Sequence, residues 1–388
     1  MRYRVPLSLL LLSLLCAGFL QLTSGSRQLN VEEQADQIGG QKLRRLQDEE
    51  EEGGQKVGIC YGQMGGNQPP AHEAVELVQS VGIQRMRLYG PDHSALEALK
   101  NTGIEVVLGV PNEHLHMLSS GQDGADQWVQ EYVKNYQDVK FRYIVVGNGI
   151  APLHAQNSEF AEFLLPAMQN IKNAISASGL QDQIKVTTAL DQSEILSQSS
   201  PPSAGEFRPD MRDFIDGIIN FLVNNNAPLL VNIHPYFSYI YYKDEIPHGL
   251  GEPTKWFVNP RLKYALFQQT QSMVRDGSLG YTNVFDAMVD SVYSALEKAN
   301  GSSLDVVVSE IGWPTAGAAD ANRKNAAAHN NNLINHVRNN GTPKRPHKSV
   351  ETYIYSLFDE NGKSPEVNKH WGVFWNNKQA KYEISFQG

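Results

Sequence analysis

Cysteine is nearly absent from this chain of 388 residues. Only Cys16 and Cys60 occur, and Cys16 lies in an N-terminal apolar segment that has the features of a removable leader. An intramolecular disulfide is therefore excluded in the mature protein. Its stability must come from a large core, which the region from Val57 onward is long enough to supply. We expect Cys60, in the apolar stretch Val57–Tyr61, to be a buried strand residue rather than a nucleophile.

The chain also lacks any uniformly apolar stretch of the ~20 residues that a membrane-spanning helix requires. Its longest apolar run, Leu7–Leu20, follows Arg2 and Arg4 and precedes small and polar residues at Thr23–Ser26. This order predicts a secretory signal peptide over residues 1–26, and the small residues favour cleavage over a signal anchor. We therefore expect a secreted, extracellular protein with no membrane partner.

Positive charge is in deficit, with 33 Lys and Arg against 42 Asp and Glu and a formal net charge of -9. This balance argues against nucleic acid as a partner, and a neutral polymer fits better. One basic concentration occurs, which we expect to be a solvated loop. It consists of Lys344, Arg345, His347 and Lys348.

Residues 27–56 are poor in apolar side chains and include the acidic run Asp48–Glu52. Such a segment cannot bury enough surface to offset its ordering entropy, which predicts a disordered linker or removable pro-segment, with a partner-binding tail as the alternative. Further along, Asn300 and Asn340 each begin an Asn-X-Ser/Thr pattern and are candidate glycosylation sites.

Short apolar runs rich in β-branched residues alternate with helical patterns from Val57 to the C-terminus. Continuously apolar runs are typical of parallel strands covered on both faces. Eight strands in this alternation predict an α/β protein, with residues 57–388 forming a single-domain (β/α)₈ TIM barrel. The expected strands are Val57–Gly62, Arg85–Tyr89, Glu105–Val110, Tyr143–Asn148, Lys185–Leu190, Leu229–Tyr236, Asp305–Glu310 and Thr352–Asp359. The expected helices are Ala71–Val81, Ala95–Asn101, Asp126–Gln137, Glu159–Ser178, Asp210–Asn224, Tyr281–Ala299 and Asn322–Asn339.

An open doubly wound sheet is the alternative fold. The glycines in Gly62–Asn67 follow the first strand, but no helix start follows them, as a phosphate-binding turn would require. The barrel is therefore favoured, and we expect no cofactor and no metal.

The barrel fold predicts the place of a functional site, because active sites of such barrels lie at the C-terminal ends of the strands. The residues there are mostly aromatic or hydrogen-bonding, which is typical of a carbohydrate site, although a single Tyr would more often be a core aromatic. The expected substrate-binding residues are Tyr61, Tyr89, Asn112, Asn148, His234, Tyr236 and Trp313. The other strand-end residues are Gly149, Asp191, Glu310, Asp359, Glu360 and Lys363.

Glu310 is the main candidate for chemistry. A buried carboxylate is unfavourable unless it is hydrogen-bonded or needed, and at a barrel strand end it is usually functional. We therefore favour a catalytic nucleophile over a structural ion-pair partner. Glu360 and Lys363 are either a surface pair or neighbours of Glu310, where the Lys would favour the ionised nucleophile.

The strand ending at Asn148-Gly149 lacks a carboxylate where a sugar-cleaving site of this layout would have Asn-Glu. Glycoside hydrolysis usually needs two carboxyl groups, one to attack the sugar and one to protonate the leaving oxygen. The sequence thus offers one candidate carboxylate without its expected partner.

Several segments in order resemble the plant glucan endo-1,3-β-glucosidases, glycoside hydrolase family 17, from about Val57 to Phe386. The matching segments are Val57–Gly62, Arg85–Tyr89, Leu108–Asn112, Phe285–Asp290, Val308–Glu310, Gly312–Pro314 and Phe358–Asn361. The resemblance implies a (β/α)₈ barrel whose groove binds linear β-1,3-glucan and cleaves internal bonds with retention of configuration. We expect a monomer, located in the apoplast rather than the vacuole.

The resemblance also implies roles for individual residues. Glu310 corresponds to the nucleophile, Glu360 and Lys363 to the auxiliary groups, and Asn148 to the Asn before the acid/base. The family's acid/base Glu falls on Gly149. Two further departures are His234, where the family usually has Tyr, and Ile311, where it usually has Ser.

Gly149 cannot transfer a proton through a side chain, whereas general acid–base assistance is typically worth ~10²–10⁴-fold in rate. We expect hydrolysis to be impaired and binding to be kept. A slow β-1,3-glucanase and a catalytically inactive, lectin-like glucan-binding protein both remain open. Transglycosylation is disfavoured because its first step needs the same acid, and Glu360 is disfavoured as a substitute because it would approach from the nucleophile's side.

Overall fold

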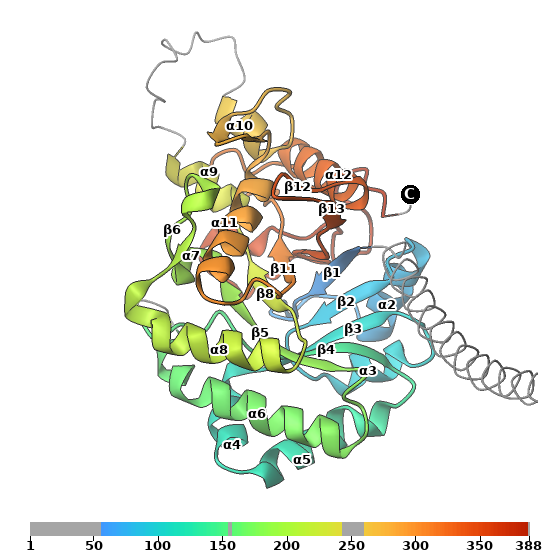
Figure 1. Ribbon diagram of the computed structural model, residues 1–388. Helices are drawn as coiled ribbons and strands as arrows, with labels where there is room; N and C mark the ends of the chain where they lie inside the picture. The colour runs from blue at the N-terminus through green and yellow to red at the C-terminus, as the bar shows by residue number, and fades with distance from the viewer. Residues whose placement is uncertain (1–55, 154–156, 243–259, 387–388) are drawn as a thin grey trace, which may run out of the picture. The chain divides into compact units, whose positions relative to one another are not determined.

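Eight parallel strands close into a barrel in the computed structural model (Figure 1). Their order around the barrel is β1-β14-β11-β8-β5-β4-β3-β2, which confirms the predicted (β/α)₈ fold. The barrel strands are β1 (Val57–Tyr61), β2 (Arg85–Leu88), β3 (Glu105–Val110), β4 (Lys140–Asn148), β5 (Lys185–Asp191), β8 (Leu229–Asn232), β11 (Val306–Ile311) and β14 (Thr352–Ile354).

The structure describes residues 56–153, 157–242 and 260–386, so the predicted signal peptide and nearly all of the predicted linker lie outside the described residues. Within these three ranges, no helix is both long and apolar enough to cross a membrane.

Helices and three small two-stranded sheets connect the barrel strands. Four of the helices, α4, α7, α9 and α10, were not expected from the sequence. The α-helices are α2 (Ala71–Ser80), α3 (His93–Leu99), α4 (Leu115–Ser119), α5 (Gln122–Tyr132), α6 (Ala161–Ala177), α7 (Gln192–Ile195), α8 (Arg212–Asn224), α9 (Pro235–Tyr242), α10 (Pro260–Ala265), α11 (Val284–Lys298) and α12 (Arg323–Asn339). The small sheets pair β6 (Leu196–Gln198) with β7 (Glu206–Phe207), β9 (Val274–Asp276) with β10 (Leu279–Tyr281), and β12 (Gly341–Thr342) with β13 (Arg345–Ser349).

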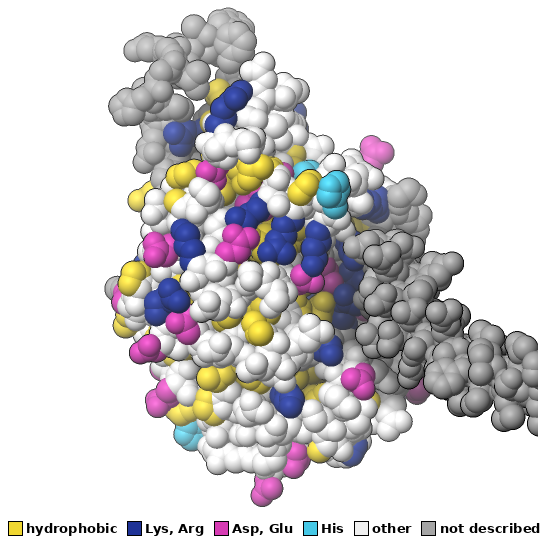
Figure 2. All heavy atoms as spheres, in the orientation of Figure 1, with side chains coloured by type: hydrophobic (Ala, Val, Ile, Leu, Met, Phe, Trp, Pro, Cys, Tyr) yellow, Lys and Arg dark blue, Asp and Glu magenta, His cyan; other side chains and the backbone are white. Residues whose placement is uncertain are grey.

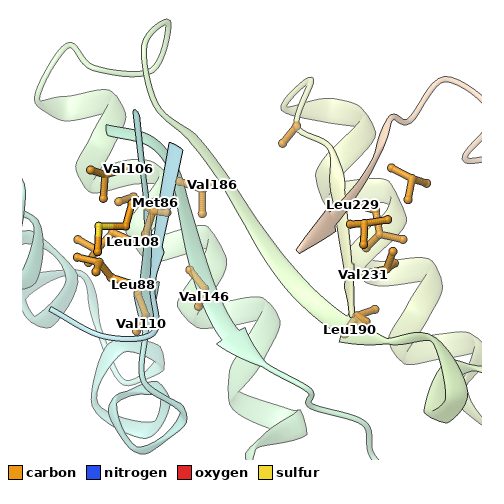
Figure 3. Packing of buried hydrophobic residues seen from close by; sticks show 14 of the residues in the cluster. Met86, Leu88, Val106, Leu108, Val110, Val146, Val186, Leu190, Leu229 and Val231 are labelled. Atoms are coloured by element: carbon orange, nitrogen blue, oxygen red, sulfur yellow. The ribbon is translucent and has the colours of Figure 1, made fainter. Parts of the chain in front are cut away.

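Side chains alternate between two buried layers along the barrel strands, because successive residues of a strand point to opposite faces. Met86 and Leu88 of β2 belong to the larger apolar cluster outside the barrel (Figure 3). Val107 of β3 belongs to a second cluster that fills the interior. Arg87 lies between Met86 and Leu88 and faces the interior, so this layer carries polar groups as well as apolar ones.

The predicted strand Leu229–Tyr236 is wrong in its second half. Strand β8 ends at Asn232, and helix α9 begins at Pro235. Proline favours the first turn of a helix, because its φ suits a helix and its missing N–H would be unpaired there. Similarly, β14 ends at Ile354 rather than at Asp359.

The basic cluster of residues 344–348 lies on the β12–β13 hairpin rather than on a free loop. Lys344 Nζ lies 2.8 Å from Glu297 Oε2, and Lys348 pairs with Asp305. Over the face shown in Figure 2, basic and acidic side chains are interspersed rather than gathered by sign. The two candidate glycosylation residues, Asn300 and Asn340, are exposed directly after α11 and α12.

Candidate active site

Glu310 reaches the barrel mouth through a break in strand pairing. Val308 of β11 pairs with Val231 of β8, but Glu310 pairs with Asn232, so Ser309 is an extra residue. Regular alternation would place Glu310 on the outer face with Val308, whereas this β-bulge turns it to the inner face. The residue is buried, at 8% exposure.

A second break lies in β4, the strand that carries the other half of the site. Between Val145 and Asn148 the strand spans three residues while the partner strand, from Thr187 to Ala189, spans two. Gly147 lies in this stretch at φ +70°, a left-handed conformation that glycine adopts without strain. Asn148 is thereby brought to the same inner face as Glu310.

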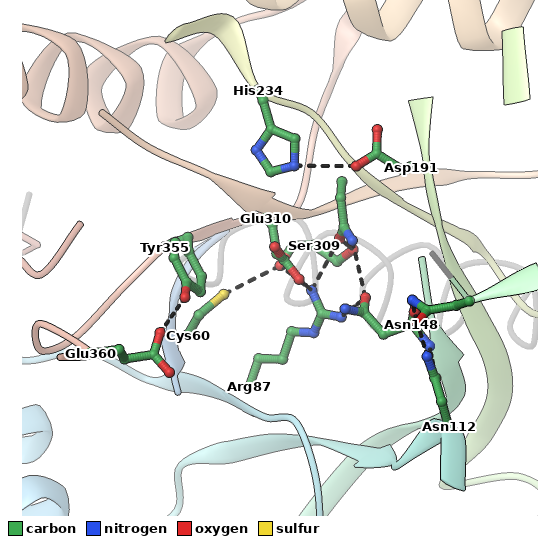
Figure 4. Close-up of polar contacts among 12 residues, drawn as sticks. Cys60, Arg87, Asn112, Asn148, Asp191, His234, Ser309, Glu310, Tyr355 and Glu360 are labelled. Atoms are coloured by element: carbon green, nitrogen blue, oxygen red, sulfur yellow. Dashed lines mark hydrogen bonds and ion pairs between the residues drawn. The ribbon is translucent and has the colours of Figure 1, made fainter. Parts of the chain in front are cut away.

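Arg87 connects these two strand ends (Figure 4). Its Nη1 donates to Glu310 Oε1 at 3.1 Å and to the main-chain oxygen of Ser309 at 2.7 Å. Its Nη2 donates to Asn148 Oδ1 at 2.8 Å. The Arg87 side chain is 2% exposed. A buried charge is unfavourable unless it is paired, and Glu310 supplies the counter-charge.

Amide groups complete this network and fix Asn148 in place. Asn232 Nδ2 donates to Asn148 Oδ1 at 3.0 Å, and Ser309 Oγ donates to Asn232 Oδ1 at 2.8 Å. Asn112 holds the Asn148 backbone from both sides, because its Nδ2 donates to Asn148 O at 3.1 Å and its Oδ1 accepts from Asn148 N at 2.9 Å. The predicted residues Asn112, Asn148 and Glu310 therefore lie in one bonded group.

Arg87→Met is expected to lower the free energy of unfolding by ~3–5 kcal/mol, because the variant leaves the buried Glu310 carboxylate uncompensated. Urea denaturation measures the change. The double variant Arg87→Met/Glu310→Gln should recover part of the loss, since the unpaired charge is then removed. A double variant no more stable than Arg87→Met would show that the ion pair is not the cause.

Position 149 combines an open space with a special backbone. Gly149 has φ +61°, and its N–H donates to Ala189 O at 2.9 Å. Among the described residues, only Asn157 Nδ2 comes within 4 Å of a Cβ placed there, at 3.9 Å. The first atom of a side chain would therefore meet no close described neighbour, while the left-handed backbone would cost the side chain about 1–2 kcal/mol.

Glu360 and Lys363 form a closed cluster with Tyr355. Glu360 is 2% exposed, its Oε1 accepts from Met64 N at 3.0 Å, and its Oε2 accepts from Tyr355 OH. Lys363 Nζ lies 3.0 Å from the same Oε2 and also donates to Tyr355 OH. Burial and the neighbouring Glu360 raise the pKa of Tyr355 well above its usual value. Both Glu360 oxygens are engaged, which fits a positioning role rather than that of a free acid.

His234 pairs with Asp191 above Glu310 (Figure 4). Its Nε2 lies 3.3 Å from Asp191 Oδ2. Burial lowers the pKa of His234, but the hydrogen bond and charge of Asp191, together with the charge of Glu310, outweigh burial and the opposing charge of Lys363. The pKa of His234 is therefore raised, and that of Asp191 is lowered because its bond to His234 outweighs its burial.

His234→Gln is expected to destabilise the fold more in mildly acidic than in alkaline solution. A raised pKa means that the folded state binds the proton more tightly than the unfolded chain. This contribution is complete below the unfolded pKa of about 6.5 and is lost as pH rises through the higher folded value. Urea denaturation of wild type and variant at pH ~6 and ~9 tests this. If the variant loses the same unfolding free energy at pH ~6 and at pH ~9, His234 does not form an ionised pair with Asp191. Asp191→Asn removes the partner of the same pair and is the matched variant.

Two of the predicted substrate-binding aromatics are buried in the wall of the site. Trp313 is 0% and Tyr236 1% exposed, and their rings pack edge to face with centroids 5.0 Å apart. Trp313 Nε1 donates to Asp320 O, and Tyr236 OH donates to Ala319 O. Neither ring has a free face for a sugar, so this structure does not support the predicted stacking contacts. The same holds for Tyr61, which is 3% exposed.

Phe237, which was not among the predicted site residues, is an exposed aromatic beside His234. It is 41% exposed, and its ring centroid lies 5.9 Å from that of His234 and 5.7 Å from that of Trp371. The aromatic residues from Pro235 to Tyr242 could have indicated Phe237. The prediction of a strand over Leu229–Tyr236 ended one residue before it. Tyr89 keeps partial exposure and lies under the Arg87 guanidinium, 4.6 Å from its ring centroid.

Arg87 and Asn232 were also missed as site residues. The signal for Arg87 was its place in Arg85–Leu88, where arginines alternate with apolar residues inside a strand predicted to be buried. Ile311, one of the two departures near the site, packs at 0% exposure in the outer apolar cluster, away from the inner face.

A buried carboxylate beside amides and aromatic rings at the C-terminal mouth of a (β/α)₈ barrel lies where the active sites of such barrels are found, and a glycoside hydrolase uses such a carboxylate to attack the sugar. The family model described as glycosyl hydrolases family 17 matches residues 57–386. The chain belongs to this family.

Its similarity to individual members extends over most of their length. It is 48% identical to a glucan endo-1,3-beta-glucosidase of Pisum sativum over 334 residues, which cover 86% of this chain and 85% of the pea sequence. It is also 48% identical to a basic vacuolar isoform from Nicotiana tabacum, with 86% of each chain covered. Among solved structures, CJP38, a beta-1,3-glucanase and allergen of Cryptomeria japonica pollen, superposes with a TM-score of 0.79 at 41% identity over 85% of this chain and 99% of its own.

Proposed function

We propose that this protein binds β-1,3-glucan at the barrel mouth and hydrolyses it far more slowly than a relative with an intact acid/base carboxylate. The observation that carries the proposal is Gly149, an open position without a side chain beside an intact group of Glu310, Arg87 and Asn148. The substrate class is supported by the glucan endo-1,3-beta-glucosidases that this chain resembles at nearly half of its aligned positions.

The chain's own residues supply one half of a retaining mechanism. Glu310 attacks the anomeric carbon of the sugar, the bond to the leaving oxygen breaks, and a glycosyl ester forms on Glu310. Arg87 holds the attacking carboxylate in position from within the barrel. The leaving sugar alkoxide receives no proton from position 149, and the water that later cleaves the ester finds no base there. Each step loses an assistance of ~10²–10⁴-fold.

A non-catalytic, lectin-like glucan-binding protein is the second candidate function. The same observation favours it, because Gly149 removes proton transfer without removing the aromatic and amide groups of the mouth. The N-terminal segment 1–26, as a secretory leader, supports a proposed location outside the cell, where wall or fungal glucan would be met.

Laminarin binding and reducing-sugar release by the purified wild-type protein test the proposal together. Calorimetry is expected to show saturable binding, and the release should be slow or absent. A protein that does not bind laminarin would overturn the proposed ligand. Rapid release would show that another group supplies the proton, and since Glu360 is fully engaged, the His234–Asp191 pair would be the next candidate.

A further inference from the structure

The site keeps Glu310 bonded to Arg87 beside Asn148 and has no side chain at position 149 to transfer a proton. We propose that it acts as a glucosyltransferase for β-glucosyl donors whose leaving group departs without a proton, such as glucosides of acidic phenols, carboxylic acids or phosphates. Its acceptors are nucleophiles that are already anionic. This inference rests on the proposed function, since it uses the same glucan-binding mouth and the same Glu310.

The first step requires a nucleophile and a stable leaving group. Glu310 is buried, turned inward by the β11 bulge, and held by Arg87 Nη1 at 3.1 Å. Its carboxylate oxygen bonds to the anomeric carbon as the bond to the leaving oxygen breaks, and the leaving group takes the electron pair as a phenolate, carboxylate or phosphate. No proton moves in this step, so Gly149 does not limit it. A glucan donor, in contrast, must expel a poorly stabilised alkoxide.

The second step favours an acceptor that carries its own negative charge. Water must lose a proton while it attacks, and no side chain at position 149 accepts one. An anion attacks the anomeric carbon directly, the ester bond to Glu310 breaks, and the carboxylate is regenerated with the new glucosyl bond in the β configuration. Two displacements thus transfer the glucosyl group without a proton.

The geometry at Gly149 provides room for such an acceptor. Apart from the neighbours of Gly149 along the chain, a Cβ there would have only Asn157 Nδ2 within 4 Å among the described residues, so the start of a side chain or an acceptor atom has room at this point. The Asn157 amide donates weakly to Asn148 O at 3.4 Å and Gly149 O at 3.3 Å. An amide nitrogen that makes only these two long bonds therefore lies beside position 149.

The full chain and 2,4-dinitrophenyl β-laminaribioside test the first step. We expect a burst of dinitrophenolate followed by slow turnover, together with a laminaribiosyl adduct that mass spectrometry locates on the peptide containing Glu310. Phenyl β-laminaribioside has a more basic leaving group, so in wild type its release of phenol in the first step should be ~10²–10⁴-fold slower than release of dinitrophenolate. In Gly149→Glu the difference between the two donors should be much smaller. Equal rates for the two donors in wild type would overturn the inference.

Sodium azide tests the second step. Azide should accelerate dinitrophenolate release after the burst and yield β-laminaribiosyl azide. Gly149→Gln is the matched control, because it fills the open space without adding an acid or base, and azide should accelerate it much less. Equal acceleration in the Gln variant would contradict the site of acceptor attack.

These outcomes separate this inference from the proposed function. A protein that fails to bind laminarin contradicts both. A protein that binds laminarin but forms neither adduct nor azide product contradicts the transfer activity alone and leaves a glucan-binding protein.

Discussion

Gly149→Glu is expected to raise laminarin hydrolysis by ~10²–10⁴-fold, the usual contribution of a positioned general acid and base. The reason is geometric as well as chemical. Position 149 follows Asn148, which Arg87, Asn232 and Asn112 hold at the inner face of the mouth. The added side chain would enter an open space, where the first described atom that its Cβ meets is Asn157 Nδ2 at 3.9 Å. Reducing-sugar release measures the gain.

The matched control is Gly149→Gln, which has nearly the same shape but transfers no proton. Both variants must accept φ near +61°, so both should lose about 1–2 kcal/mol of unfolding free energy in urea denaturation. A gain shared by Glu and Gln would point to an altered backbone rather than to proton transfer. A Glu variant no faster than wild type would show that the missing acid is not the limiting defect. His234 would then be the next suspect, since Ile311 packs away from the site.

Glu310→Gln is expected to abolish the hydrolysis that Gly149→Glu restores. The substitution is best made in the Gly149→Glu background, where the starting rate is high enough for the loss to be measured. The rate should fall by at least the ~10²–10⁴-fold gain, because the nucleophile and the acid act in the same step and their effects are not additive. The amide of the Gln side chain cannot form a stable glycosyl ester.

Laminarin binding separates chemistry from misfolding in this experiment. The Gln side chain keeps the volume of Glu310, and its oxygen can still accept from Arg87 Nη1, so calorimetric affinity should stay close to that of the parent. Hydrolysis that survives at the parental rate would exclude Glu310 as the nucleophile. Loss of both binding and hydrolysis would indicate that the variant misfolds because the buried Arg87 has lost its counter-charge.

Much of the barrel could be predicted because its strands are continuous apolar runs separated by helical patterns. The errors fall at the ends of strands, where a residue that ends the strand lies inside a longer run that resembles one strand. In the region from Leu229 to Tyr236, apolar side chains are followed by the alternation Val231-Asn232-Ile233-His234, which also suits a strand. Periodicity alone therefore could not show that β8 ends at Asn232 and α9 starts at Pro235. Because of that error, Tyr236 was predicted at a strand end and as a sugar contact, whereas it lies on helix α9 with its ring buried.

Polar residues inside the barrel were also hard to predict from the sequence. Arg87 lies in a run that predicts a buried strand, and by itself a buried Arg indicates only an ion pair. Its bonds reach Asn148, Asn232 and Glu310 on three other strands, up to 223 residues away along the chain. No local pattern contains such a contact, because closure of the barrel brings these positions together.

The sequence by itself determined the fold class, the nucleophile candidate Glu310 and the missing carboxylate at Gly149, because each depends on residue type and on place along a strand. Only the tertiary structure decided which way these residues face. The bulges in β11 and β4 shift the alternation by one residue, and thereby turn Glu310 and Asn148 inward. A bulge is a feature of the pairing between two strands. The sequence of one strand does not show how it pairs with its neighbour, so it cannot show where the bulge lies.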